Sequence, residues 1–190
     1  MMNLKGYPEI TMAKPMIFGI GMNKTGGSSL KLALRALGFR CMQGARLLKR
    51  AMRENAGKDV SPLYPYDENH DAFVDSPINV NFKLLDAAYP GSRFILTIRD
   101  REAWLVSRVA QFGGTREEHE KKWQKHMVDV YQHFSNRQED LLVYNLCGGE
   151  GWTPLCNFLN VSVPTEPIPW INKTGAKRKN LARRRLGLQD

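Results

Sequence analysis

IFGIGMNKTGGSSL, residues 17–30, is the stretch that decides the fold. An apolar run stops at Gly19, passes through a short loop that contains Lys24, and enters a segment with apolar residues at positions 30, 33, 34 and 37. This spacing predicts an amphipathic helix, and Gly38 is a suitable residue for its end. The order strand, glycine loop, helix directs backbone N–H groups, a helix N-terminus and one ammonium group toward the same point. It predicts an anion site, and in particular a phosphate site.

The lysine of this loop does not stand where the commonest phosphate loop has it. The Walker pattern G-x-x-x-x-G-K-[ST] places lysine directly after the second glycine. Here Lys24 precedes Gly26 and Gly27, and Gly27–Ser28 occupy the positions of the Lys–Ser/Thr pair. An ordinary turn with a surface lysine is the alternative interpretation.

A second block carries an arginine and a serine at a defined spacing. Residues 93–99 (RFILTIR) form a β-rich apolar run that predicts a buried strand. Arg99 ends the run, and Ser107 follows eight positions later, about two turns into the next predicted helix, so both can face one ligand. The planar fork of arginine binds phosphate through two hydrogen bonds. The alternative is a local salt bridge for Arg99 and a helix-surface position for Ser107.

Together the two blocks resemble sulfotransferases that use 3′-phosphoadenosine 5′-phosphosulfate (PAPS) as the donor. The order lysine, hydroxyl residue, glycine, small residues is similar to the family's 5′-phosphosulfate loop, and Arg99 with Ser107 is similar to its 3′-phosphate motif. The family loop usually has two threonines where Gly27 and Ser28 stand here. One hydroxyl is therefore missing, and this difference concerns the affinity for the donor rather than its identity.

The resemblance extends over roughly residues 15–173 and is closest to bacterial-type members of the family. Those members have a segment like residues 150–159 (EGWTPLCNFL), a proline-rich stretch like residues 163–169, and an Asn–Lys pair, here Asn172–Lys173. It implies a three-layer α/β/α fold with a central parallel sheet, as in P-loop kinases. The alternation of predicted strands and helices also favours a parallel α/β sheet with ligands at the carboxyl ends of its strands.

The resemblance also implies roles for individual residues. Lys24 would stabilise the phosphate that leaves when the sulfuryl group moves to a hydroxyl or amine acceptor, releasing 3′-phosphoadenosine 5′-phosphate (PAP). Arg99 and Ser107 would hold the 3′-phosphate of the donor. No metal is expected. The predicted donor-binding loop consists of Asn23, Lys24, Thr25, Gly26, Gly27, Ser28 and Ser29.

A base must accept the proton of the acceptor, and Asp75 is the candidate. It follows the short apolar run 72–74, in the strand before the Arg99 strand, where the family commonly has a histidine or glutamate base. His70 is the second candidate, although it precedes the strand. Alternatively, Asp75 caps a helix that starts near Pro77.

The remaining elements are read from local patterns. Residues 16–37 form the first strand–helix unit, and the long polar helix carries His119, His126 and His133 at intervals of seven. Seven residues span about 10.5 Å along a helix, so the three histidines are badly placed to bind one metal ion together. These histidines are expected to pack or to line an acceptor cleft.

The other predicted elements are a helix at 41–54, a loop at 55–70, a helix from Pro77 to Ala88, a helix broken at Gly113–Gly114, a polar helix at 116–137 and a strand at 141–144.

Length and composition predict one globular domain. The chain has 190 residues, 42% hydrophobic and 25% charged, and is expected to comprise a flexible arm at 1–14, the α/β domain at 15–175 and a basic tail or helix at 176–190. No apolar window is long enough to span a membrane, and the first residues do not read as a secretory signal. Three cysteines without a C-x-x-C pair suit a reducing compartment, so a cytoplasmic location is expected.

The net charge of +9 requires an explanation. No nucleic-acid motif is present, and nucleic acid is not expected as a partner. The basic residues between 177 and 185 suggest a solvated tail, contact with donor phosphates, or contact with an anionic surface. The acceptor is expected to be a small molecule, a lipid or a glycan. Two other functions remain open: a P-loop kinase in which Asp75 holds Mg²⁺, and a non-catalytic module that binds PAP.

Overall fold

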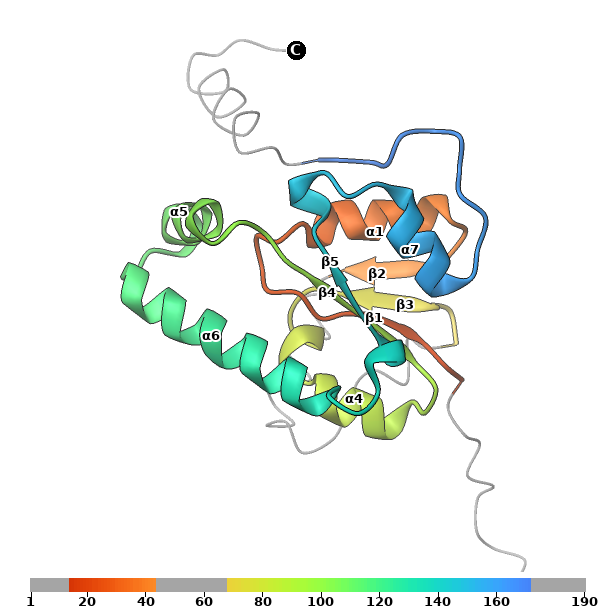
Figure 1. Cartoon of the computed structure of the whole chain (residues 1–190), viewed down its shortest axis with the longest axis horizontal. Coiled ribbons are helices and arrows are strands. Elements are labelled where there is room, and N and C mark those ends of the chain that lie inside the picture. Colours follow the sequence, from red (N-terminus) through yellow and green to blue (C-terminus); the bar gives the residue numbers. More distant parts are fainter. Residues whose placement is uncertain (1–13, 44–67, 172–190) are drawn as a thin grey trace, which may run out of the picture.

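The computed structural model describes residues 14–43 and 68–171. These residues form a five-stranded parallel sheet in the order β2–β3–β1–β4–β5, as Figure 1 shows. The strands are β1 Ile17–Gly19, β2 Cys41–Gln43, β3 Ala72–Val74, β4 Arg93–Thr97 and β5 Leu141–Tyr144. The α-helices are α1 Gly27–Ala36, α4 Phe82–Ala88, α5 Arg101–Phe112, α6 Arg116–His133 and α7 Trp152–Leu159. Short 3₁₀ helices lie at Ile78–Val80, Gln138–Asp140 and Leu146–Gly148.

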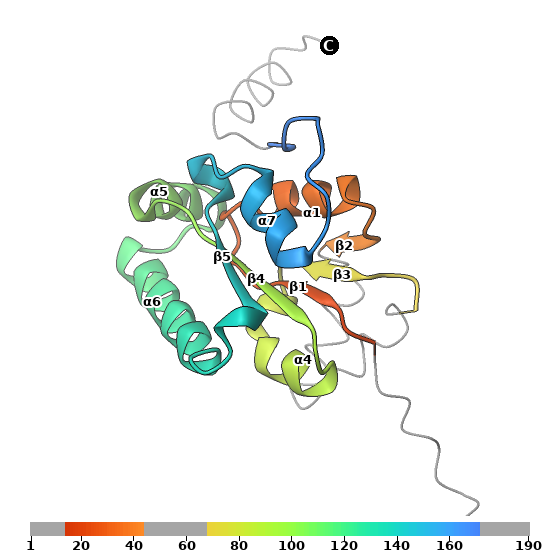
Figure 2. The ribbon, with the colours of Figure 1, turned by 45° about the vertical axis from the view of Figure 1, so that its right-hand side comes forward.

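Helices cover both faces of the sheet. Figures 1 and 2 show α1 and α7 on one face and α4 and α6 on the other. The apolar face of α1, including Leu30 and Leu34, packs with Leu155 of α7 in one core cluster, while Phe82 of α4 and Val130 of α6 belong to the other. Burial on both faces explains why the strands read as continuous apolar runs. The predicted three-layer α/β/α fold with a parallel sheet is confirmed.

The strand order places the ends of β1, β3 and β4 beside one another. In the register of the sheet, Gly19 at the end of β1 lies next to Val74 of β3 and Ile95 of β4. The chain crosses from β3 on one side of β1 to β4 on its other side, so the strand order reverses at β1. Ligands of open α/β sheets bind at such a point, beyond the carboxyl ends of the strands. The segments that follow these three strands therefore meet at one place.

Three sequence predictions about helices need correction. Residues 41–43 form strand β2, not the start of a helix, because they pair with Ala72–Val74 at the edge of the sheet. The helix expected from Pro77 to Ala88 is divided into a 3₁₀ turn and α4, and the side chain of Asn81 bonds back to the carbonyl of Pro77 at 2.8 Å. The predicted polar helix ends at His133 rather than at 137. Residues 44–67, which hold the rest of the predicted helix and most of the predicted loop, lie outside the described residues, as do residues 1–13 and the predicted basic tail.

Each of the three histidines of α6 contacts an oxygen atom of the protein through its Nε2 atom. His119 Nε2 lies 2.7 Å from the carbonyl of Gly113, and His133 Nε2 lies 2.7 Å from the carboxylate of Asp86. His126 Nε2 lies 2.8 Å from the carbonyl of Ile20, and burial lowers the pKa of this histidine. This last contact fixes α6 to the segment that leaves β1. In residues 14–43 and 68–171, no group of three His, Cys, Asp or Glu side chains is arranged to hold a metal ion.

In the part of the chain that the structure describes, no helix combines the length and the apolar character that crossing a bilayer requires.

Candidate active site

The loop between β1 and α1 presents an uncapped helix N-terminus. Leu30 N–H bonds to the carbonyl of Gly26 at 2.9 Å, which closes the first turn of α1. The N–H groups of Gly27, Ser28 and Ser29 precede this bond and have no partner within the helix. The N-cap residue, Gly26, has a φ of 106° and no side chain that could cap them. The positive end of α1 is therefore open to an anion.

Thr25 holds the loop in shape. Its side chain is buried, and its hydroxyl donates to the carbonyl of Met22 at 2.6 Å and lies 2.7 Å from the hydroxyl of Thr97. The close approach of β4 requires glycine at position 21, because a Cβ there would lie 1.9 Å from Thr97 Oγ1. Lys24 has a φ of 79°, in the left-handed region that a side chain rarely adopts. The lysine thus sits in a fixed and strained turn.

The two serines of the predicted donor loop differ in their surroundings. Ser29 is buried, and its Oγ accepts from the N–H of Ile171 at 3.1 Å and lies 3.4 Å from the carbonyl of the same residue. Ser28 is partly exposed, and its Oγ accepts from Gln43 Nε2 at 3.0 Å. The hydroxyl proton of Ser28 is therefore available to a ligand, whereas the Ser29 hydroxyl connects α1 to the segment that follows α7.

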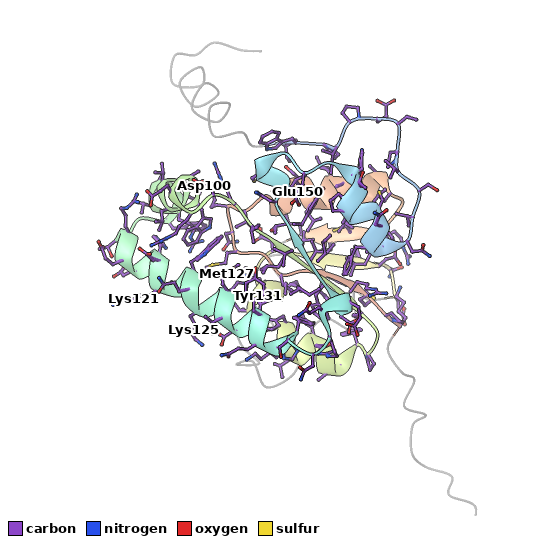
Figure 3. The ribbon with its side chains drawn as sticks, in the orientation of Figure 1. Asp100, Lys121, Lys125, Met127, Tyr131 and Glu150 are labelled. Carbon is purple, nitrogen blue, oxygen red and sulfur yellow. The ribbon has the colours of Figure 1, made fainter. Side chains whose placement is uncertain are left out.

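Arg99 lies against the lysine-bearing turn. Its Nη1 donates to the carbonyl of Lys24 at 3.3 Å, and the indole N–H of Trp104 donates to the carbonyl of Asn23 at 3.0 Å. Asp100, labelled at the start of α5 in Figure 3, caps this helix by accepting from Ala103 N–H at 2.9 Å. Ser107 is 5% exposed, which contradicts the surface alternative for this serine. Arg99 and the inner face of α5 are thus brought to the loop.

Asp75 also faces the loop. Its Oδ1 accepts from Asn23 Nδ2 and from the N–H of Ser76, the latter at 2.9 Å, and its Oδ2 accepts from Gln43 Nε2 at 3.2 Å. The helix-cap alternative is not observed, because the N-cap of the next 3₁₀ turn is Pro77 and Asp75 makes no side-chain cap there. A carboxylate has about four acceptor positions, and three are occupied by these donors. One remains on Oδ2 for a further donor.

A comparison with known families assigns the chain to one of them. A family model described as a sulfotransferase domain matches residues 16–117 and 108–177. The chain belongs to the sulfotransferase domain family. No curated protein matches the chain in a sequence search. Membership assigns this sulfotransferase domain to the transferases and to sulfuryl transfer as a general reaction.

Gln43 is a site residue that the sequence did not reveal. Its amide nitrogen bridges Ser28 of the sulfotransferase loop and Asp75 at the end of β3. The sequence pattern places Gln43 within a predicted helix. It is the last residue of a strand of three, and a strand this short shows no alternation that would mark one of its residues as part of a site. Its role depends on β2 lying beside β3, which is a property of the sheet order.

His70 lies at the other end of the sheet. It precedes β3, whereas the loop of this sulfotransferase and Asp75 follow the strands at their carboxyl ends. Its ring packs near that of Phe73, with centroids 5.7 Å apart. The second candidate for the base is therefore wrong in its location, because three extended residues of β3 separate it from the loop side.

Proposed function

We propose that this sulfotransferase transfers a sulfuryl group from PAPS to a hydroxyl or amine acceptor and releases PAP. The observation that carries the proposal is the hydrogen bond from Arg99 to the carbonyl of Lys24. It puts a guanidinium next to a lysine turn and an open helix N-terminus, so two anion-binding elements lie side by side. A nucleotide with phosphates on both its 3′ and 5′ oxygens has the charges that such a pair would bind.

Each element then has a role toward the donor. The N–H groups of the first turn of α1 and the hydroxyl of Ser28 would hold the 5′-phosphate. Arg99 and Ser107 would hold the 3′-phosphate, which distinguishes PAPS from ATP. Lys24 would stand beside the oxygen that bridges phosphorus and sulfur and neutralise the charge that develops on it. Thr25 and Ser29 would use their hydroxyls to fix the loop rather than to bind the donor.

Asp75 would serve as the base. As the acceptor oxygen bonds to sulfur, the bond from sulfur to the bridging oxygen breaks, and its electron pair stays on the phosphate of PAP. The proton of the acceptor passes to the remaining position on Asp75 Oδ2. Asn23 and Gln43 hold the carboxylate toward the loop through their amide nitrogens. The protein would thus contribute positioning and charge stabilisation, as in the related phosphoryl transfers.

Arg99→Ala tests the proposal through binding. Loss of charged hydrogen bonds to the 3′-phosphate costs roughly 1.5–3 kcal/mol, so the Kd for PAP is expected to rise about 10- to 150-fold. The Kd for adenosine 5′-phosphate, which has no 3′-phosphate, should change less than about threefold. Titration calorimetry with both nucleotides measures the difference. Arg101→Ala is the matched control, because Arg101 lies two positions later and pairs on the surface with Glu120.

The same titrations separate the competing functions. Tighter binding of ATP–Mg²⁺ than of PAP by the wild-type protein would favour the kinase, with Asp75 as its metal ligand. Equal losses of PAP and adenosine 5′-phosphate affinity in Arg99→Ala would contradict the assigned role of Arg99. PAP binding without transfer of label from PAPS to any of a broad set of hydroxyl and amine acceptors would favour a non-catalytic module.

Gly27→Ser is expected to tighten donor binding. A Cβ at this position would lie 3.9 Å from Gln43 Nε2 and 4.0 Å from Asp75 Cβ, which are ordinary contacts. The added hydroxyl restores a phosphate donor, and one more hydrogen bond contributes roughly 0.5–1.5 kcal/mol, or about a two- to tenfold lower Kd for PAP. Gly27→Ala is the control that adds the Cβ alone. The free energy of unfolding of both variants should rise by about 0.4–1 kcal/mol, which denaturant titration measures, because glycine is the more flexible residue in the unfolded chain. A weaker affinity of Gly27→Ser for PAP would contradict this role of the position.

A further inference from the structure

Arg108 is a buried cation with an incomplete set of partners. The residue is 9% exposed, and its guanidinium lies 4.3 Å from the ring centroid of Phe112 and 5.7 Å from that of Trp104. Nη1 donates to Asn23 Oδ1 at 3.3 Å. Nε is buried and has no hydrogen-bond partner in the described structure. Two aromatic rings thus cover the guanidinium, while its Nε–H group donates to no other group of the described residues.

Such a group is costly without an anion. Arginine keeps its charge, and burying a charge requires pairing and hydrogen bonds. Among the described residues, no carboxylate lies within ion-pair distance of Arg108. Burial lowers the pKa of Arg108, and the more distant charge of Asp75 raises it. An unsatisfied buried donor of this kind needs an explanation, and a ligand anion supplies one.

The location of Arg108 indicates which ligand would bring that anion. The amide of Asn23 accepts from Arg108 and donates to Asp75, so it connects the guanidinium to the candidate base. Arg99, in contrast, bonds to the backbone of the lysine turn. Arg108 is therefore linked through a single side chain, that of Asn23, to the carboxylate that would receive the acceptor's proton. Phe112, which is 54% exposed and ends α5, is the neighbour that an entering group would displace.

We propose that Arg108 binds an anionic group of the acceptor, so that the acceptor is a hydroxyl or amine compound that already carries a carboxylate, phosphate or sulfate. The proposal rests on the proposed function and names the class of its second substrate. The planar fork of arginine suits all three oxyanions, because each offers two oxygens to adjacent N–H groups. A neutral acceptor would leave the buried charge unpaired in the complex.

Arg108→Met tests this with inorganic sulfate as the probe. Sulfate is titrated into the PAP-saturated wild-type protein and followed by tryptophan fluorescence, since the guanidinium lies over Trp104. Wild type should bind sulfate, and Arg108→Met should bind it at least tenfold more weakly. The Kd for PAP should change less than twofold. The melting temperature should not fall, because methionine removes an unpaired charge and keeps the packing of the stem. Arg101→Met, on the same helix, should leave all three measurements unchanged.

Three results would overturn the proposal: no sulfate binding by the wild-type PAP complex, equal sulfate binding by Arg108→Met, or a tenfold loss of PAP affinity in that variant, which would assign Arg108 to the donor. If the wild-type protein does not bind PAP, the proposed function fails. The role of Arg108 is then tested separately, by comparing sulfate binding of wild type and Arg108→Met without nucleotide. A second readout uses labelled PAPS with the acceptor pairs phenol and 4-hydroxybenzoate, and glucose and glucuronate. Any preference for the anionic members should disappear in Arg108→Met.

Discussion

Lys24→Ala is expected to lower turnover at saturating PAPS by about 10²- to 10³-fold, the range observed when one charge-stabilising group is removed from a transition state. The ammonium is assigned to the leaving phosphate, where negative charge grows as the bond to sulfur breaks. Binding of PAP should weaken much less, because the N–H groups of α1, Ser28 and Arg99 remain. Release of PAP from PAPS and transfer of label to an acceptor measure the effect.

Two variants separate this role from folding. Lys24 has a left-handed φ, so Lys24→Gly should fold at least as well as wild type while losing the same activity. Lys125→Ala removes a lysine that Figure 3 shows on the outer side of α6 and that pairs with Asp129, and it should keep full activity. Near wild-type turnover of Lys24→Ala with saturating PAPS would remove Lys24 from the mechanism.

Asp75→Asn is expected to lower turnover by about 10²-fold or more while PAP still binds, since a positioned general base contributes roughly 10²- to 10⁴-fold. The amide keeps the shape of the carboxylate but cannot accept the acceptor's proton. The new NH₂ group at position 75 would face the Gln43 amide in place of Oδ2. Because the Gln43 amide can rotate to present its oxygen to that NH₂ group, the site should remain assembled. Single-turnover transfer and PAP calorimetry separate the chemical step from binding.

The control for Asp75 is Asp129→Asn, which removes a partly exposed carboxylate of α6 that pairs with Lys125. It should keep the wild-type rate. An unchanged rate in Asp75→Asn would exclude this residue as the base. Loss of PAP binding together with the rate would instead indicate that the carboxylate supports the donor loop through its bonds to Asn23 and Gln43.

Local sequence patterns predicted the elements that carry the site. The apolar run before Gly19 and the helical spacing after Gly26 specified β1 and α1, and the run that ends near Arg99 specified β4 and the start of α5. Each pattern reflects burial of one stripe or one strand, so it can be read within a window of ten to twenty residues. Segment 41–43 was misread because a three-residue edge strand is too short to show a period, and its extended form depends on β3.

The sequence by itself determined the fold class, the lysine turn and the eight-residue spacing between Arg99 and Ser107, because these depend on neighbours along the chain. Only the tertiary structure decided that Asn23, Gln43, Asp75 and Arg108 form one connected set of hydrogen bonds. These residues come from the loop after β1, from β2, from the end of β3 and from α5. Their contact follows from the order of strands in the sheet and the packing of α5 on the loop, and long-range packing leaves no period in the sequence.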